Sequence, residues 1–103
     1  MNMNEYQALA RRTAGQASIT IWALGVAGEA GEVADYIKKV VGHGHPMDRE
    51  KLTKELGDVL WYIAVLAAEI NVTLDEVAQM NVDKLRARYP DGFDSKRSME
   101  RTE

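Results

Sequence analysis

The chain has 103 residues, the length of a single domain. With 46% hydrophobic and 28% charged residues, its composition is that of a globular protein and excludes a disordered chain. The absence of cysteine excludes disulfides, thiolate metal sites and a cysteine nucleophile. A net charge of -3, without a long basic block, argues against binding to a nucleic-acid backbone.

Helical periodicity organises the chain from its start. Residues 3–13, rich in Ala, Leu, Arg and Gln, predict a first helix. Apolar residues then recur at alternating steps of four and three, which predicts a long second helix from Ile19 that ends at residues 42–46. Asp48 is a suitable N-cap for a third helix with the same alternation. The two apolar stripes are Ile19, Ala23, Val26, Ala30, Val33, Ile37 and Val40, and Leu52, Leu56, Val59, Ile63, Leu66 and Ile70.

A fourth helix closes the predicted domain. Residues 73–76 have the form of a capping box and open this helix, which ends before Pro90. We therefore expect an all-α fold with one helical domain over residues 1–93 and a loosely ordered polar tail over residues 94–103. The second and third helices should form a long antiparallel hairpin at the centre of a helical bundle.

The third helix also predicts self-association. Residues 59–63 are apolar nearly all round this helix, so it must be covered on every side. Three other helices of this size are too few, and we expect a homodimer or a dimer of dimers to complete the bundle. The longest apolar run, residues 59–68, is shorter than the roughly 20 residues that span a bilayer. No signal peptide is recognisable, so we expect a cytoplasmic protein with no membrane or nucleic-acid partner.

An internal repeat is the most informative feature of the sequence. Residues 29–37 (EAGEVADYI) align with residues 55–63 (ELGDVLWYI), with five of nine positions identical. Each copy places two acids at i and i+3, so their Cβ atoms lie about 5–6 Å apart on a helix. Each acid directly precedes a stripe residue and should flank the apolar seam. If the helices pack antiparallel with the repeats level, four carboxylates converge: those of Glu29, Glu32, Glu55 and Asp58.

Converging carboxylates repel one another unless a cation lies among them. Mg²⁺ prefers oxygen ligands and retains water, and such an ion usually serves a phosphate substrate. Gly25, Gly28, Gly31 and Gly57 each cost about 1 kcal/mol relative to Ala inside a helix, which indicates close backbones or room for a ligand. The alternative is that the acids are solvated faces of two amphipathic helices.

The acid pairs resemble a known signature. Residues 28–32 (GEAGE) and 55–58 (ELGD) resemble the Glu-x-x-Glu … Glu-x-x-Asp pattern of the MazG-like all-α nucleoside triphosphate pyrophosphohydrolases, and residues 81–93 resemble that family's closing segment. The resemblance covers about residues 24–93. It implies Mg²⁺-dependent hydrolysis of a nucleoside triphosphate to the monophosphate and pyrophosphate, in a dimer or tetramer, with Mn²⁺ as a substitute metal. The four acids carry over as metal ligands and catalytic groups, with Glu29 our first candidate for the base that activates water.

Basic residues supply candidates for phosphate contacts. Asn81, Lys84 and Arg88 share one face of the fourth helix, where Lys and Arg would meet phosphate oxygens. The alternative is a solvated face, since basic residues are favourable near a helix C-terminus. Lys39 lies on the acid stripe of the second helix, and its alternative role is an ion pair with Asp35.

Aromatic and histidine side chains are weaker candidates. Trp22 and Tyr62 lie on the acid stripes and would stack on the base of a nucleotide, although aromatic residues at helical spacing more often belong to the core. His43 and His45 lie in a glycine-rich loop with no third ligand nearby, so we interpret them as loop residues and not as metal ligands.

Two other functions remain open from the sequence. The first is a related pyrophosphohydrolase dedicated to one substrate, such as dUTP or phosphoribosyl-ATP. The second is a non-catalytic helical dimerisation module whose acids are structural or bind regulatory Mg²⁺. The module predicts no nucleotide hydrolysis, and it leaves the cost of the helical glycines unexplained.

Overall fold

The computed structural model describes residues 1–101, and this part of the chain is helical and contains no strand. In chain order the helices are α1 (Met3–Arg11), α2 (Ile19–His43), α3 (Arg49–Glu69), α4 (Leu74–Arg88) and α5 (Ser95–Glu100). The predicted all-α class is confirmed. Helix α5 lies in the tail that we expected to be loosely ordered, and the last two residues of that tail lie outside the described residues.

The helix ends form where the capping residues predict them. The Asp48 side chain accepts hydrogen bonds from the backbone N–H groups of Glu50 and Lys51, which begins α3. The Thr73 side chain accepts a hydrogen bond from the N–H of Glu76, which begins α4. Gly44 ends α2 with a left-handed φ of 71°, a conformation that glycine adopts without a Cβ clash. Local sequence therefore determines where the hairpin turns.

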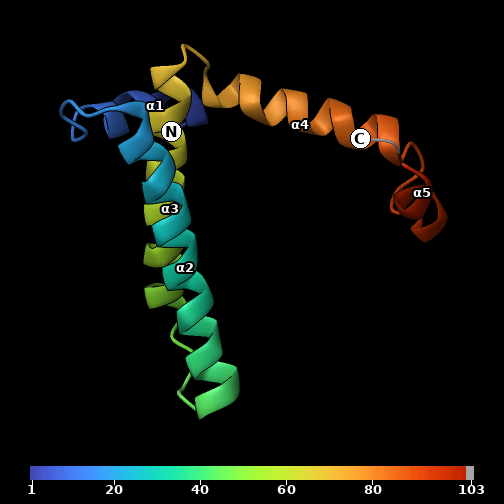
Figure 1. Cartoon of the computed structure of the whole chain (residues 1–103), viewed down its shortest axis with the longest axis horizontal. Helices are drawn as coiled ribbons and strands as arrows, with labels where there is room; N and C mark the ends of the chain where they lie inside the picture. Colours follow the sequence, from blue (N-terminus) through green and yellow to red (C-terminus); the bar gives the residue numbers. More distant parts are fainter. Residues whose placement is uncertain (102–103) are drawn as a thin grey trace.

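Helices α2 and α3 lie side by side and make the most extensive helix–helix contact of the described chain (Figure 1). Helix α1 packs on α3 near the start of α2, whereas α4 turns away from the hairpin and carries α5 at its far end (Figure 1). The radius of gyration is 16.6 Å, where a compact chain of this length has about 13 Å. The single chain is therefore an open arrangement with one projecting arm.

The membrane test gives a limited result. Among residues 1–101, no single helix is both long and apolar enough to cross a bilayer. Helices α3 and α4 are long and apolar enough only when they are taken together, and the chain bends by 99° between them.

The core is small and lies at one end of the hairpin. It consists of Ala10, Trp22, Ala64, Val65, Ala67 and Leu74, which come from α1, α2, α3 and α4. The buried side chain of Gln7 ties these elements together. Its amide nitrogen donates to the carbonyl oxygens of Ala64 (3.1 Å) and Val72 (3.0 Å), and its amide oxygen accepts from the N–H of Leu74 (3.1 Å). This long-range contact fixes α1 against the turn between α3 and α4.

The predicted apolar stripes are covered unevenly within one chain. Ile19, Leu56 and Ile70 are 47%, 52% and 56% exposed, whereas eight of the thirteen stripe residues are partly buried, and Ile63 and Leu66 pack against the core. Tyr62 adds a close contact between the two helices, because a Cβ built on Gly25 would overlap with its ring.

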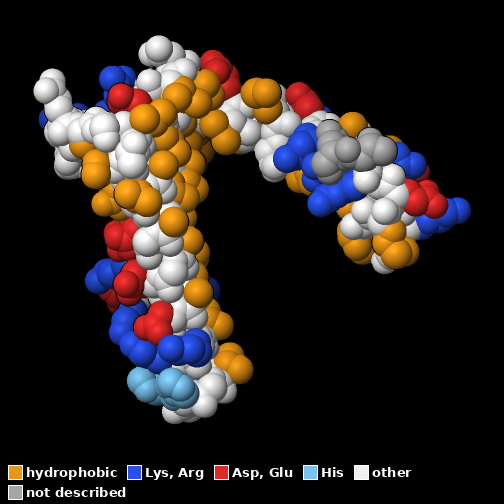
Figure 2. Space-filling model, viewed as in Figure 1, with side chains coloured by type: hydrophobic (Ala, Val, Ile, Leu, Met, Phe, Trp, Pro, Cys, Tyr) orange, Lys and Arg blue, Asp and Glu red, His pale blue; other side chains and the backbone are white. Residues whose placement is uncertain are grey.

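Large apolar side chains remain uncovered along the hairpin and the arm. Leu24 on α2 is 63% exposed and Met80 on α4 is 71% exposed, and Leu85 on α4 is also exposed. Figure 2 shows hydrophobic side chains along one edge of the hairpin and on α4. Contiguous exposed apolar surface of this kind is typical of an interaction face.

We expect Gly25→Ala to lower the free energy of unfolding by about 1–3 kcal/mol, because the added methyl group forces the Tyr62 ring out of the seam. Urea unfolding at one protein concentration measures this change. Gly28→Ala is the matched control, since a Cβ at Gly28 meets no heavy atom within 4 Å. That variant should gain up to about 1 kcal/mol from helix propensity. Equal losses in both variants would contradict the packing of Tyr62 on Gly25.

Candidate metal centre

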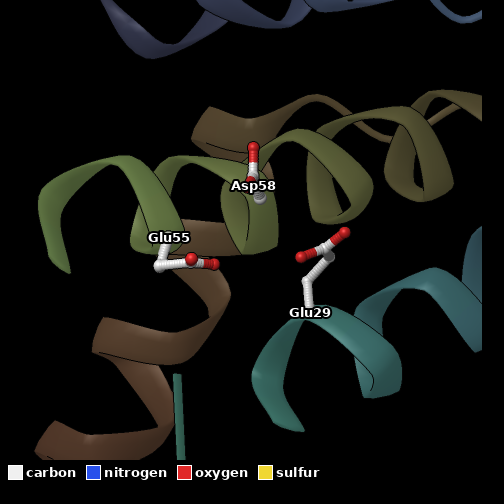
Figure 3. Close-up of side chains that lie close together, drawn as sticks. All are labelled: Glu29, Glu55 and Asp58. Carbon is white, nitrogen blue, oxygen red and sulfur yellow. The ribbon is translucent and has the colours of Figure 1, made fainter. Parts of the chain in front are cut away.

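Three of the four predicted acids meet between α2 and α3. Glu29 extends from α2, and Glu55 and Asp58 come from successive turns of α3 (Figure 3). One carboxylate oxygen of each residue lies within 4.8 Å of the other two. Glu29 and Glu55 are half-buried, and Asp58 is exposed. The convergence of the repeats places these three carboxylates around one point.

Glu32, the fourth predicted acid, lies beside this group. It is exposed on the next turn of α2 and lines a cavity of about 150 Å³ together with Glu55. The structure therefore places Glu32 at the border of the acid cluster, one turn nearer to the loop that joins α2 and α3.

The acid cluster carries negative charge without a direct ion pair. Within residues 1–101, none of the four acid side chains forms a hydrogen bond or a salt bridge, although the charge of Glu32 acts on Lys39. Burial, followed by the charges of Asp58, Glu55 and Glu32, raises the pKa of Glu29 above its ordinary value. Burial and the neighbouring carboxylates therefore disfavour the ionised form of Glu29, and a bound cation would favour it.

The donor set fits a hard divalent cation. Three carboxylates without nitrogen or sulfur suit Mg²⁺ or Mn²⁺. Ligand oxygens around an octahedral Mg²⁺ are about 3 Å apart when adjacent and about 4.2 Å apart when opposite. The oxygens of Glu29, Glu55 and Asp58 lie within 4.8 Å of one another, so side-chain rotations could bring them to one ion.

An aromatic cluster holds α2 and α3 together on one side of the acids. The Trp61 ring packs edge-on against Tyr62, with centroids 4.9 Å apart, and against Trp22, at 5.9 Å. The Trp61 Nε1–H donates to the Thr13 hydroxyl at 2.9 Å. Trp22 is only 5% exposed. Its ring faces are therefore largely covered, whereas Tyr62 is half-exposed and better placed to meet a ligand.

Trp22 also borders a larger cavity. This cavity, of about 550 Å³, is lined by polar side chains of Arg11, Gln16 and Glu69 in addition to the Trp22 ring. The Trp22 Nε1–H is buried and has no hydrogen-bond partner among the described residues.

Hydrogen bonds tie the helices together on the loop side of the acids. The Tyr36 hydroxyl accepts from the Asp48 N–H at 2.7 Å and donates to the Asp48 carbonyl oxygen at 3.4 Å. Lys39 lies 3.0 Å from an Asp35 carboxylate oxygen, which is the ion pair that we kept as its alternative role. Lys39 also lines the cavity that Glu32 and Glu55 share. Hydrogen bonds from Lys39 and Lys38 hold the pKa of Asp35 below its usual range.

The candidates on α4 are not brought to the acids within one chain. Asn81 and Lys84 are exposed, and Arg88 is half-buried near the end of this helix. Helix α4 packs on α1 and α3 and points away from the hairpin (Figure 1). The Arg97 guanidinium donates to the Arg88 carbonyl oxygen at 2.6 Å, which holds α5 on the end of α4.

Two residues near the acids escaped the sequence analysis. The pKa of the Tyr6 hydroxyl on α1 is raised by burial and by the charge of Asp58. This contact joins distant parts of the chain, so no local pattern signals it. Lys51 lines the cavity beside Glu55. Its i,i+4 spacing from Glu55 on a predicted helix is a signal that would have found it.

Comparisons with known proteins point to one family. A family model described as the MazG nucleotide pyrophosphohydrolase domain matches residues 17–93, which include all four acids. The chain is 42% identical over 73 residues to the Gene 37 protein of Mycobacterium phage L5. The match covers 67% of this chain, and the chain spans 64% of that relative's length. No solved structure matches the chain significantly.

We expect Glu29→Gln to raise the thermal unfolding temperature of the protein in chelator at neutral pH. The folded state raises the pKa of Glu29, so between its unfolded and folded pKa values the folded protein binds more protons than the unfolded chain. The charge of Glu29 therefore lowers stability as pH rises through this window. The gain in Glu29→Gln should disappear at about pH 4, below the ordinary carboxyl pKa.

Glu50→Gln is the control for this measurement. Glu50 is exposed on α3 and lies 3.4 Å from the Lys54 ammonium, so its charge has a partner. We expect no gain in stability for this variant. A gain in Glu29→Gln that is equally large at about pH 4 would show that charge repulsion is not its cause.

Proposed function

The chain belongs to the MazG nucleotide pyrophosphohydrolase domain family, and from this premise we propose that it is an Mg²⁺-dependent nucleoside triphosphate pyrophosphohydrolase. Its products are a nucleoside monophosphate and pyrophosphate. The observation that carries this proposal is the convergence of Glu29, Glu55 and Asp58 without a cationic partner among residues 1–101. Such a cluster suits a metal that retains open positions for phosphate oxygens.

The acids divide the chemical work in this proposal. Glu29, Glu55 and Asp58 would hold the metal, and Glu32 would border it. When bound, the metal would supply charge neutralisation for the triphosphate and activation of the attacking water. Glu29 accepts the proton of the attacking water in this proposal, because it is the acid that α2 places opposite Glu55 and Asp58. A bond forms between the water oxygen and the α-phosphorus, and the bond from the α-phosphorus to the bridging oxygen breaks, which releases pyrophosphate.

The nucleoside extends from the acids toward the aromatic cluster. Tyr62 lies one turn beyond Asp58 on α3 and is half-exposed, so its ring offers a surface on which the base stacks. Trp61 and Trp22 pack against Tyr62 and limit its motion. In this proposal Trp22 supports Tyr62 and borders the base site.

A second copy of the chain completes the site in this proposal. The small core and the exposed apolar side chains of α2, α3 and α4 support a homodimer or a dimer of dimers. The projecting α4 of one protomer would then reach the hairpin of its partner. Asn81, Lys84 and Arg88 would meet the phosphates bound at the partner's acids.

Pyrophosphate release from a panel of nucleoside triphosphates tests the reaction. The panel includes dUTP and phosphoribosyl-ATP, with Mg²⁺ or with EDTA. We expect turnover of at least one member with Mg²⁺ and none with EDTA. Asp58→Asn and Glu55→Gln should each lower kcat by at least about 100-fold, since the loss of an outer-shell partner already costs 10–100-fold.

Glu50→Gln, on the exposed face of α3, should keep the wild-type rate. Turnover that survives in EDTA, or in Asp58→Asn, would contradict the metal assignment. No turnover of any substrate by a folded protein would favour the non-catalytic module.

Mixed oligomers test the contribution of α4 from a partner. Asp58→Asn and Lys84→Ala proteins should each be nearly inactive, and co-expression should restore activity. In a mixed dimer the acids of one protomer and the Lys84 of the other form one intact site. Random pairing in a two-fold dimer therefore restores about one quarter of wild-type activity. No restoration would show that Lys84 acts within its own chain or outside the site.

A further inference from the structure

The segment after α4 folds back onto the end of that helix (Figure 1). An α-helix leaves its last four carbonyl groups without partners inside the helix. In α4 the Leu85 carbonyl oxygen accepts from the Tyr89 N–H at 2.8 Å. The Arg97 guanidinium of α5 donates to two of the others, from Nε to Arg88 at 2.6 Å and from Nη2 to Ala87 at 3.4 Å. A side chain from α5 therefore completes the hydrogen bonding at this helix end.

The chain that brings Arg97 back to α4 is held by local contacts. Gly92 turns the chain with a φ of 93°, a conformation that favours glycine, and its N–H donates to the Tyr89 carbonyl oxygen at 3.1 Å. The Tyr89 and Phe93 rings pack with their centroids 5.4 Å apart. The Asp94 side chain then accepts from two backbone N–H groups in the first turn of α5. Residues 89–97 thus form a C-terminal cap on α4.

The C-terminal cap acts directly on the backbone of Arg88. Arg88 is the last residue of α4, and the last turn of a helix frays when its carbonyl groups have no partners. The 2.6 Å bond from Arg97 ends on the carbonyl oxygen of Arg88 itself. Hydrogen bonds from an ionised donor are about twice as strong as neutral ones. The cap therefore fixes the backbone from which the Arg88 side chain extends.

The two bonds from Arg97 depend on the shape of its side chain. A guanidinium is a planar fork with a permanent charge, whereas a lysine ammonium is a compact charge without that fixed geometry. Nε and Nη2 reach the carbonyl oxygens of two successive residues. A cation at this position also interacts favourably with the C-terminal end of the helix dipole. The geometry therefore calls for arginine, and not only for a positive charge, at position 97.

We propose that Arg97 is a positioning residue for the hydrolysis reaction, because it holds the last turn of α4 so that the Arg88 side chain is presented to the triphosphate. This inference rests on the proposed function, in which Arg88 meets the phosphates at a partner's acids, and deepens it. Arg97 itself touches no substrate. An arginine on an ordered helix end loses less conformational freedom on binding phosphate than one on a frayed end. The C-terminal cap is then part of what makes the enzyme active.

Steady-state kinetics of four proteins test this role: the wild type, Arg88→Gln, Arg97→Gln and the double variant. The substrate is the nucleoside triphosphate that the wild type hydrolyses fastest. We expect Arg97→Gln to lower kcat/KM by about tenfold, the loss expected for a hydrogen bond to a charged group. Arg88→Gln should lower kcat/KM by more, and Arg97→Gln should change the same parameter, KM or kcat, that Arg88→Gln changes.

The double variant separates positioning from general destabilisation. In the Arg88→Gln background, Arg97→Gln should change kcat/KM by less than about twofold, because the side chain that Arg97 positions is already absent. Equal losses with and without Arg88 would overturn the proposal, since they would show that Arg97 acts on the whole fold. If Arg97→Gln does not fold, Arg97→Lys takes its place in the same four-protein comparison.

Two further variants separate the geometry of the cap from the charge at the end of the arm. Arg97→Lys keeps the charge but lacks the planar fork, so its kcat/KM should lie about threefold below that of the wild type. Wild-type kinetics in Arg97→Lys would show that charge alone matters and would overturn the proposal. Lys96→Gln is the matched control on α5, because within residues 1–101 the Lys96 side chain forms no hydrogen bond or salt bridge with the end of α4. It should keep the wild-type kcat/KM.

The outcomes distinguish this inference from the proposed function. If the wild type hydrolyses a nucleoside triphosphate and either Arg88→Gln or Arg97→Gln keeps the wild-type kcat/KM, the positioning role is wrong and the proposed function stands. If the wild type hydrolyses no member of the panel, the proposed function fails and this inference fails with it. A loss in Arg97→Gln that disappears in the Arg88→Gln background supports both.

Discussion

Like-charged carboxylates are held together because the two helices that carry them are fixed on both sides. On one side Tyr62 packs on the bare backbone at Gly25 and against Trp61. On the other side the Tyr36 hydroxyl bonds the backbone of Asp48. These contacts keep α2 and α3 together, and burial followed by the charges of the neighbouring acids raises the pKa of Glu29. The geometry of the acid cluster depends on this constraint.

The same constraint links the site to the proposed assembly. The main buried cluster lies at one end of the hairpin, and the acid cluster lies farther along it. Leu24, Leu56 and Met80 are left on outer surfaces, where only another surface can remove them from water. In the function that we propose, a metal offsets the repulsion among the carboxylates, and a second protomer covers the exposed apolar side chains.

Much of the site was predictable because its signal is local or repeated. The i,i+3 acid pairs, in two matched copies, indicated which carboxylates converge, and three of the four meet in the structure. Glu32 lies beside them and lines a cavity together with Glu55. Tyr6 could not be predicted, since its proximity to Asp58 depends on how α1 docks on the hairpin.

By itself, the sequence determined the all-α class, the helix ends and the identity of the acids. These features depend on capping side chains such as Asp48 and Thr73, and on periodicity within one helix. Only the tertiary structure decided which helix faces meet and where α4 points. Those outcomes follow from contacts between distant residues, such as the hydrogen bonds of Gln7 at the α3–α4 turn. Local periodicity predicts an apolar stripe, whereas contacts such as that of the Tyr62 ring with the backbone at Gly25 decide how closely two helices approach.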